Sequence, residues 1–490
     1  MEWLVLCAFG ASLLLCIILD RSILYALCFG LLLFLLYGRR KGFSWRELAG
    51  MVISGVATVK NILITFLLIG VLTAVWRAAG TIPVIVCYAS GWIRPSVFLL
   101  MAFLLNSAVS FLTGTSFGTA ATMGVICAAM GTSMGVSPVL TGGAVLSGAF
   151  FGDRCSPVST SALLVAAVTK TDIYQNIRGM LRSALVPFLL TCALYFAMGL
   201  RPAQAGELMD LRAVFAKSFA LHWSSLLPAA VILALSLMRV NMKAAMAASI
   251  LTAVPLCLFL QHISAAGLLR AAVFGFTPSD PEAAAMMSGG GILSMLRVAG
   301  IVCISSGYSD LFRRTGLLDS AKESIARLAD RTTPFIATLV TSAIAGMIAC
   351  NQTLTILLTN QLCGELHAGP GSGISQVRKT GRDAEPHAGS GADPNAGRDT
   401  ELHAGADSRR EQFAIDLEDT AVVVAPLVPW SIAGAVPLSA IGAPSAAILA
   451  AAYLYLIPLW RAVVSWAGRR PGRADPTAAG GSAEQRGVSH

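Results

Sequence analysis

The sequence predicts an all-α polytopic membrane protein with roughly 10–12 transmembrane or half-membrane helices, organised as two inverted repeats with re-entrant hairpins and broken helices. Of its 490 residues, 56% are hydrophobic and only 12% are charged, whereas about a quarter of the residues in a soluble domain carry charge. Successive apolar runs approach the length of about 20 residues that a helix needs to cross a bilayer. Polar, proline-containing interruptions recur in both halves of the chain, which is typical of transporters that bind substrate at a repeat interface.

The apolar runs divide the chain into four regions. A helical hairpin occupies 1–45, the first transport repeat 46–220 and the second 221–465, and a basic tail at 466–490 is expected to be disordered. The apolar segments lie at about 3–19, 22–37, 50–76, 95–112, 183–200, 222–238, 243–260, 288–306, 334–350 and 445–464. We therefore expect one continuous membrane domain.

Positive charge gathers in short loops and near the C-terminus rather than in one basic domain. The residues concerned are Arg39, Arg40, Lys41, Arg46, Arg239, Lys243, Arg469, Arg470 and Arg473. This is the positive-inside pattern of membrane proteins, so the net charge of +9 indicates a lipid bilayer as partner and not nucleic acid. The eleven cysteines are scattered without CxxC spacing and are expected to be small buried hydrophobic residues.

One stretch interrupts the second repeat. Residues 364–411 are rich in Gly, Ala, Asp and Arg and repeat ELHAG or EPHAG three times, so they cannot build a core. We expect a disordered low-complexity insertion in a loop. Metal binding by His367, His387 and His403 is the alternative interpretation.

The region 113–131 is too rich in Gly, Ser and Thr to face lipid, and irregular backbone at membrane depth needs protein or water around it. If this region is re-entrant, the basic loop 170–182 lies opposite the loop 38–47; if it crosses fully, both loops are cytoplasmic. The charge pattern favours the second topology and the polar composition favours the first.

The two halves show parallel interruptions. A polar hairpin at 113–124 precedes a broken helix at 148–160 that carries a carboxylate and Pro157. A polar segment at 349–360 precedes a second broken helix at 417–437. The helix-breaking prolines of the second one are Pro426 and Pro429.

Asp153 is the central candidate for the site. It lies beside Arg154 and the break at Pro157 inside apolar sequence, and an ionisable residue at this depth indicates a functional site. A carboxylate there can hold H+ or Na+ but not both readily, which is the simplest basis of cation/proton exchange. The structural alternative is an Asp153–Arg154 pair that caps a helix end.

Oxygen ligands surround this carboxylate in the sequence. A proline frees a backbone carbonyl, and freed carbonyls with hydroxyls are ligands that Na+ takes in unwound transporter helices. Hydroxyl residues can instead serve close helix packing. The candidate cation- and proton-binding residues, with Asp153 as the Na+ ligand, are Ser156, Ser159, Thr160, Thr115, Ser116 and Thr119 in the first half and Asn351, Gln352, Thr355, Glu418 and Asp419 in the second. Glu418 and Asp419 could alternatively lie at the water interface.

A hydrolase is the alternative from a different class. Gly114 to Gly118 fits GxSxG with Ser116 as nucleophile, but that motif requires a preceding soluble strand. The available bases, His222 and His262, lie in no recognisable motif. A binding hairpin explains these residues better.

At these residues the chain resembles the NhaC-type Na+/H+ antiporter family of the wider ion-transporter superfamily. The similarity lies in TGTSFGTAATMG (113–124), SGAFFGDRCSPVSTSA (147–162), NQTLTILLT (351–359) and LEDTAVVVAPLVPWS (417–431). The resemblance covers about 50–465 without the insertion, and implies inverted repeats with hairpins and exchange of Na+ for H+ or of organic acids such as malate and lactate. Members of the family read roughly G-D-K-x-S-P-x-S-D-T-T, so Thr160 stands where a second acidic residue is expected.

We therefore expect a secondary antiporter that exchanges Na+ or Li+ for H+ across the plasma membrane, and not an enzyme. The transported ions are its ligands and no cofactor is expected. A monomer and a homodimer both stay open. The alternative is an organic-acid or amino-acid exchanger that uses the same site, whose hairpin amides could hold a carboxylate. A passive channel is less favoured because no filter motif is visible.

Overall fold

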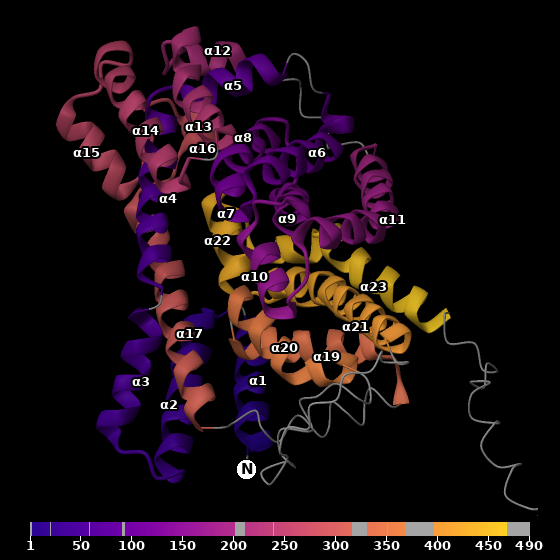
Figure 1. The fold of residues 1–490 in the computed structure, drawn as a ribbon. Helices are drawn as coiled ribbons and strands as arrows, with labels where there is room; N and C mark the ends of the chain where they lie inside the picture. The colour runs from indigo at the N-terminus through magenta and orange to yellow at the C-terminus, as the bar shows by residue number, and fades with distance from the viewer. Residues whose placement is uncertain are drawn as a thin grey trace, which may run out of the picture.

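The protein is an all-α polytopic membrane protein (Figure 1). The computed structural model describes residues 2–19, 21–57, 59–90, 94–200, 211–238, 240–315, 331–349, 351–368 and 396–467. Within these ranges every regular element is a helix, and the one isolated bridge joins Phe276 and Gly289.

Several helices have the length and composition to cross a membrane. Three are long and apolar enough by themselves: α6 (Pro95–Thr113), α11 (Ile173–Gly199) and α14 with η3 (Met242–Leu260). Two bent helix pairs also meet this criterion when each pair is counted as one span. One pair joins α3 (Trp45–Ala57) to α4 (Lys60–Ala78) through a 46° bend. The sequence predicted one unbroken segment at 50–76, so this break is a correction.

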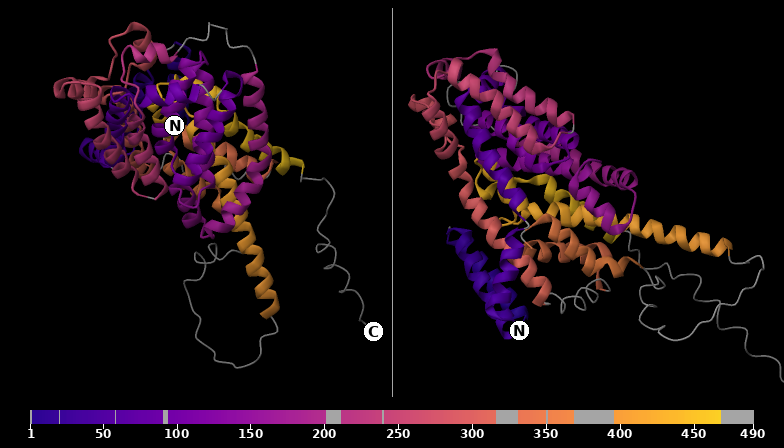
Figure 2. Two further views of the ribbon diagram at one scale, coloured as in Figure 1. Left: turned by 90° about the horizontal axis from the view of Figure 1, so that it is seen from above. Right: turned by 60° about the vertical axis from the view of Figure 1, so that its left-hand side comes forward.

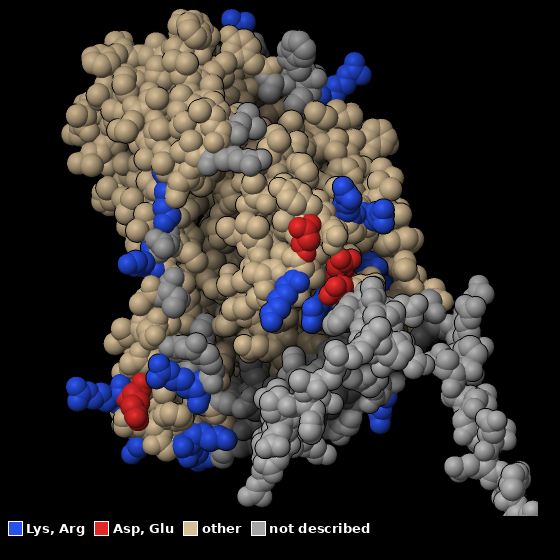
Figure 3. All heavy atoms as spheres, viewed as in Figure 1, with Lys and Arg blue, Asp and Glu red and all other residues tan. Residues whose placement is uncertain are grey.

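The N-terminal helices form a layer of their own at the bottom of Figure 1. Helices α1 (Glu2–Ile18), α2 (Ile23–Arg40) and α3 pack with α17 (Leu296–Thr315) in a separate apolar cluster. Its centre is a set of edge-to-face rings, in which Phe34 lies 5.1 Å from both Phe9 and Tyr308. Exposed Lys and Arg side chains gather over the loop between α2 and α3 (Figure 3), as the positive-inside pattern predicts.

The larger core contains the first interrupted region. Helix α6 leads through a turn into α7 (Ser116–Thr119), the π-helical η1 (Ala120–Gly124) and α8 (Val125–Ser133), and is followed by α9 (Pro138–Cys155) and α10 (Thr160–Thr169). Glycines let α6 and α9 approach closely: a Cβ on Gly148 would lie 2.5 Å from the Phe103 carbonyl oxygen, and one on Gly152 would overlap the α6 backbone at Ser110 and Phe111. This contact fixes the end of α9, where Asp153 lies.

The second interrupted region comprises α19 to α22. It contains α19 (Pro334–Ala349), α20 (Gln352–Ala368), α21 (Ala396–Leu417), the π-helical η5 (Glu418–Val422), η6 (Ala425–Leu427) and α22 (Ile432–Ala440). Residues of α10, α20 and α21 share a third apolar cluster, so the two interrupted regions meet directly. The segment 407–440 bends by 56° at its break. Helix α23 (Ala452–Ala467) closes the described chain.

The remaining elements complete the bundle on the other side of α4. They are α5 (Thr81–Ser90), α12 (Leu211–Ala216), η2 (Trp223–Leu226), α13 (Leu227–Leu237), α15 (Ala265–Phe274), α16 (Pro281–Met287) and η4 (Ile292–Met295). The short η7 (Ser445–Ala450) instead packs against α9.

Three expectations on local structure need correction. The polar composition of 113–131 led us to expect irregular backbone, yet apart from the turn at Gly114 and Thr115 this stretch is helical. The polar segment after Asn351 is likewise a regular helix, because α20 starts at Gln352. The ends of the insertion are also helical, since α20 runs to Ala368 and α21 starts at Ala396 and extends away from the bundle (Figure 2). Residues 369–395 and 468–490, with His387, lie outside the described residues.

Candidate functional site

The first helix break places Asp153 in the interior. Helix α9 ends at Cys155, a turn contains Pro157, and α10 starts at Thr160. Ser159 caps α10 by accepting hydrogen bonds from the Ser161 and Ala162 amides, which is the usual role of a serine at this position. The Asp153 carboxylate therefore lies in the last turn of one helix and faces the first turn of the next.

Only neutral donors hold the Asp153 carboxylate within the described part of the chain. Ser159 Oγ donates to Oδ1 at 3.2 Å, and Ser116 Oγ and Gln352 Nε2 donate to Oδ2 at 3.4 and 3.2 Å. Ser161 Oγ donates to the Asp153 carbonyl oxygen at 3.0 Å and lies 2.8 Å from Ser159 Oγ. A buried charge without an ionic partner is costly, so this site favours a bound cation or proton.

The tip of the α6–α8 hairpin brings Ser116 to Asp153. Gly114 has a φ of 65°, and a Cβ there would lie 2.7 Å from the backbone of Val158. The left-handed backbone and the close approach together require glycine at this position. Thr115 caps α7 by accepting from the Gly118 amide, and Thr119 Oγ1 donates to the Thr115 carbonyl oxygen. The hairpin therefore directs Ser116, and not Thr119, toward the carboxylate.

The second region contributes Gln352 from the start of α20. Its Nε2 donates to Asp153 and, at 3.3 Å, to the carbonyl oxygen of Val422 in η5. Gln352 therefore bridges the two halves of the chain at one carboxylate. Asn351 caps the same helix start, where its Oδ1 accepts from the Thr353 amide and its carbonyl oxygen accepts from Thr355 Oγ1.

Glu418 and Asp419 are buried in the π-helical turn η5 and do not lie at the water interface. Among the described residues, neither carboxyl oxygen of Glu418 has a hydrogen-bond partner, although Asp153 and Arg154 lie near enough to act on it electrostatically. π-Helical turns occur frequently at functional sites. Because it is buried and within electrostatic range of Asp153, Glu418 is a second candidate titratable group.

Asp419 is held by two guanidinium groups. Arg154 Nη2 donates to its Oδ1, and Arg461 Nε of α23 lies 3.0 Å from its Oδ2. Arg154 also donates to Ser183 Oγ at 2.7 Å and to the Met180 carbonyl oxygen at 3.2 Å. The structural alternative of an Asp153–Arg154 pair is thus replaced by an Arg154–Asp419 pair that joins the two broken helices.

The structure brings together only part of the predicted set. Ser116, Ser159 and Gln352 converge on Asp153, and Glu418 lies within electrostatic range of it. Ser156 is buried in the α9–α10 turn and accepts from the Val158 amide, whereas Thr160 is exposed and does not lie with this group. Thr115, Thr119, Asn351 and Thr355 shape the backbone around the site, and Pro157, Pro426 and Pro429 lie in or next to the breaks.

Some residues at the site were not predicted from the sequence. Arg461 and Asp416 form an ion pair of 2.7 Å next to Asp419, and Ser183 of α11 contacts both Arg154 and Asp419. Arg461 could have been found from the sequence, because it lies within the apolar segment 445–464 and ionisable residues at membrane depth indicate function. No signal in the sequence identifies Ser183.

The hydrolase and metal interpretations gain nothing from this geometry. Ser116 faces the Asp153 carboxylate, while His222 caps η2 and contacts Ser224. Among the described residues no group of three or more His, Cys, Asp or Glu side chains could hold a metal ion.

Comparisons with known proteins agree with one family. The model of the Na+/H+ antiporter family matches residues 1–172 and 148–371. The chain is 29% identical over 356 residues to the malate-2H+/Na+-lactate antiporter of Bacillus subtilis (strain 168), which covers 71% of this chain and 75% of that protein. It is 25% identical to the Na+/H+ antiporter NhaC of Alkalihalophilus pseudofirmus, over 89% of this chain and 88% of that one. The arginine/ornithine antiporter ArcD of Halobacterium salinarum is 24% identical over 89% of this chain and 84% of its own length.

Proposed function

Because the chain belongs to the Na+/H+ antiporter family, we propose that it exchanges Na+ or Li+ for H+ at Asp153 across the plasma membrane. Its antiporter relatives imply a transporter rather than an enzyme. The observation that supports Asp153 as the exchange site is its set of partners: two hydroxyls and one amide, with no cationic side chain in ion-pair distance among the described residues.

Such a carboxylate needs an external positive charge. Na+ prefers oxygen ligands, and transporters supply them from unwound backbone and hydroxyl groups. The hydroxyl oxygens near Asp153 are those of Ser116 and Ser159. The Val422 carbonyl oxygen accepts from the same Gln352 Nε2 that donates to Asp153. A proton on the carboxyl satisfies the same requirement, so the cation and the proton compete for one group.

Glu418 extends this exchange site. Its carboxyl is fully buried and has no hydrogen-bond partner in the part of the chain that the structure describes, so the charged form would be costly and the neutral form is favoured. We assign it a proton that leaves when Asp153 binds the cation, because two adjacent carboxylates resist ionising together.

A second candidate is exchange of a small organic acid or amino acid. Three observations favour it: the names of two relatives, a malate/lactate antiporter and an arginine/ornithine antiporter, the neutral Thr160 at the position of the expected second acid, and the guanidinium groups of Arg154 and Arg461 nearby. In this alternative the same broken helices hold a substrate carboxylate or ammonium.

Proteoliposomes with an imposed pH gradient distinguish the candidates. Lumenal pH is followed while Na+, Li+, K+, malate, lactate, arginine or ornithine is added, with Asp153→Asn as the matched inactive variant. Collapse of the gradient by Na+ or Li+ alone supports cation/proton exchange. A response to an organic substrate without a response to cations supports the second candidate and rejects the first.

A further inference from the structure

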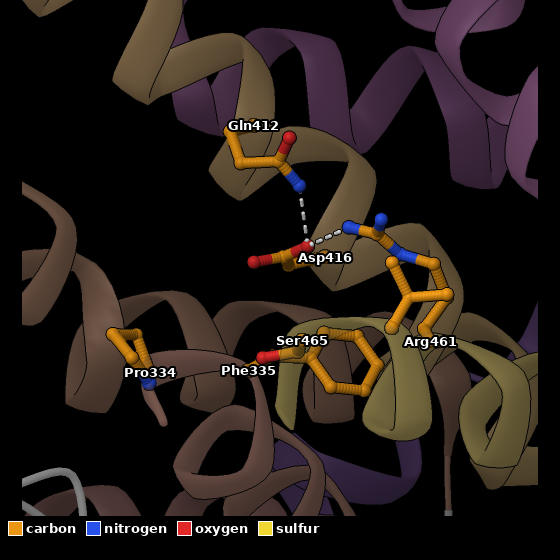
Figure 4. Close-up of a pocket in the computed structure, with 7 residues that line it drawn as sticks. Pro334, Phe335, Gln412, Asp416, Arg461 and Ser465 are labelled. Atoms are coloured by element: carbon orange, nitrogen blue, oxygen red, sulfur yellow. Dashed lines mark hydrogen bonds and ion pairs between the residues drawn. The ribbon is translucent and has the colours of Figure 1, made fainter. Parts of the chain in front are cut away.

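A surface pocket lies at the outer end of the buried charges. It has a volume of about 310 Å³, which is room for several water molecules. Its walls come from three helices, and the six labelled residues are Pro334 and Phe335 of α19, Gln412 and Asp416 of α21, and Arg461 and Ser465 of α23 (Figure 4). None of these residues contacts Asp153 itself.

The pocket opens next to water-exposed charge. In α21 the residues one to two turns before Asp416 are polar and include the exposed pair Asp407 and Arg410. Gln412 on the rim is itself exposed. This end of the three helices is therefore accessible from an aqueous phase, and not only from lipid.

Charged side chains lead from the pocket into the interior. Arg461 Nη2 contacts Asp416 Oδ1 at 2.7 Å, its Nε lies 3.0 Å from Asp419 Oδ2, and Asp419 contacts Arg154. Side-chain exposure falls along this row, from 19% for Arg461 and 6% for Asp416 to 0% for Asp419 and Arg154. Arg461 is thus the boundary between the pocket and the buried groups.

The charges favour a cation in this pocket. With Glu418 protonated, three carboxylates, those of Asp416, Asp419 and Asp153, stand against two guanidiniums, those of Arg461 and Arg154. Three minus two leaves one carboxylate, that of Asp153, which has no cationic partner in ion-pair distance among the described residues. An anion entering here would approach an excess of negative charge, whereas a cation is attracted inward.

The contact between Arg461 and Asp419 is less directional than the other ion pairs of this charged row. Neither Arg461 Nε nor Asp419 Oδ2 has hydrogen-bond alignment in their 3.0 Å contact, so charge alone holds them together. The Arg461 guanidinium also lies 5.5 Å from the centre of the Phe335 ring, an interaction that supports a guanidinium at the pocket wall. Arg461 can therefore leave Asp419 while Asp416 and Phe335 still hold it.

We infer that this pocket is a vestibule for a hydrated monovalent cation and that Arg461 is the gate between it and the buried carboxylates. This inference rests on the proposed function for the identity of the cation. Asp416 draws the cation into the vestibule and holds Arg461 in place. Displacement of Arg461 from Asp419 opens the path toward Glu418 and Asp153.

Native cysteines provide a test that does not depend on transport. Cys155 is buried behind Arg154, whose Nη1 lies 3.3 Å from its Sγ. Cys127 is buried in α8 against Asn106, away from the pocket. Purified full-length protein in nanodiscs is treated with the trimethylammonium-ethyl methanethiosulfonate cation, and each cysteine is read by peptide mass spectrometry.

We expect Val464→Cys, on the pocket wall, to be modified while Cys155 in the same protein stays protected. In Arg461→Ala, Cys155 should react roughly tenfold faster than in the wild type. This corresponds to a loss of about 1.4 kcal/mol in the free energy that favours the closed over the open state. Arg461→Lys should retain most of the protection, and so should the matched surface variant Arg410→Ala.

Cys127 separates gating from unfolding, because a loosened fold exposes it as well. If Arg461→Ala exposes both cysteines, the readout moves to Arg461→Lys with and without Asp416→Asn, where loss of Asp416 should expose Cys155 alone. A Cys155 that remains protected in the folded variants, or an unreactive Val464→Cys, overturns the inference. Either result leaves the proposed exchange at Asp153 intact, since the pH-gradient assay measures it separately.

Discussion

Asp153 and Asp419 are buried aspartates of the two broken helices, yet they are held in opposite ways. Among the described residues, Asp153 accepts only from hydroxyl and amide groups, whereas Asp419 lies between the guanidiniums of Arg154 and Arg461. A paired carboxylate is already neutralised and contributes to structure, while an unpaired one requires a ligand or a proton. Burial alone therefore does not distinguish the proposed exchange residue Asp153 from Asp419, whereas the charge of their partners does.

The largest effect is expected from Asp153→Asn. The amide keeps the shape of the side chain but removes the charge that a cation or proton must neutralise, so exchange in proteoliposomes should fall to the level of empty vesicles. Unfolding stability should stay equal or rise, because an uncompensated buried charge is lost. Exchange at the wild-type rate in this variant would remove Asp153 from the mechanism.

Arg154→Gln tests the opposite side of the comparison. The substitution leaves the buried Asp419 carboxylate poorly compensated, which should lower the free energy of unfolding by about 3–5 kcal/mol. Denaturant unfolding in detergent measures this loss. The matched double variant Arg154→Met with Asp419→Leu removes both charges and should recover most of that loss. Equal stability of Arg154→Gln and wild type would show that the pair has no structural role.

Glu418→Gln asks whether the orphaned carboxyl carries a transported proton. We expect Na+ flux to persist while the number of protons exchanged per Na+ falls, because the amide cannot release a proton. Parallel measurement of radioactive Na+ and lumenal pH in the same vesicles gives this ratio. An unchanged ratio contradicts the assignment.

Ser159→Ala removes one of the hydrogen bonds that the Asp153 carboxylate accepts, so its expected effect on exchange is smaller. A hydrogen bond to a charged group contributes about 1.5–3 kcal/mol, so the KM for the cation should rise about tenfold or more with little change in maximal rate. The N-cap of α10 is lost as well, at about 1 kcal/mol of stability. Thr160→Ala is the matched control, because its side chain is exposed, and its KM should equal that of the wild type.

The same contrast explains how much the sequence could predict. Asp153, the break at Pro157 and the neighbouring serines were visible because polar residues stand out in an apolar run. The pairing of Arg154 with Asp419 was not, because 265 positions separate the two residues and only the folded chain brings them together. Thr160 was misplaced for a local reason: it directly follows the capping Ser159, and its side chain is exposed where α10 begins.

The smallest effect concerns the repeat-rich insertion. The low-complexity pattern predicted disorder over 364–411, but the described ends of this stretch belong to α20 and α21, and Gln412 and Asp416 of α21 line the pocket. A deletion should therefore be limited to 369–395, replaced by a short Gly/Ser linker. Since composition gives these residues no core to build, exchange and stability should match the wild type. Deletion of 364–411 should by contrast slow exchange, because it removes the part of α21 that precedes Gln412 and Asp416; equal activity of both deletions would mean that this helix extension does not support the vestibule.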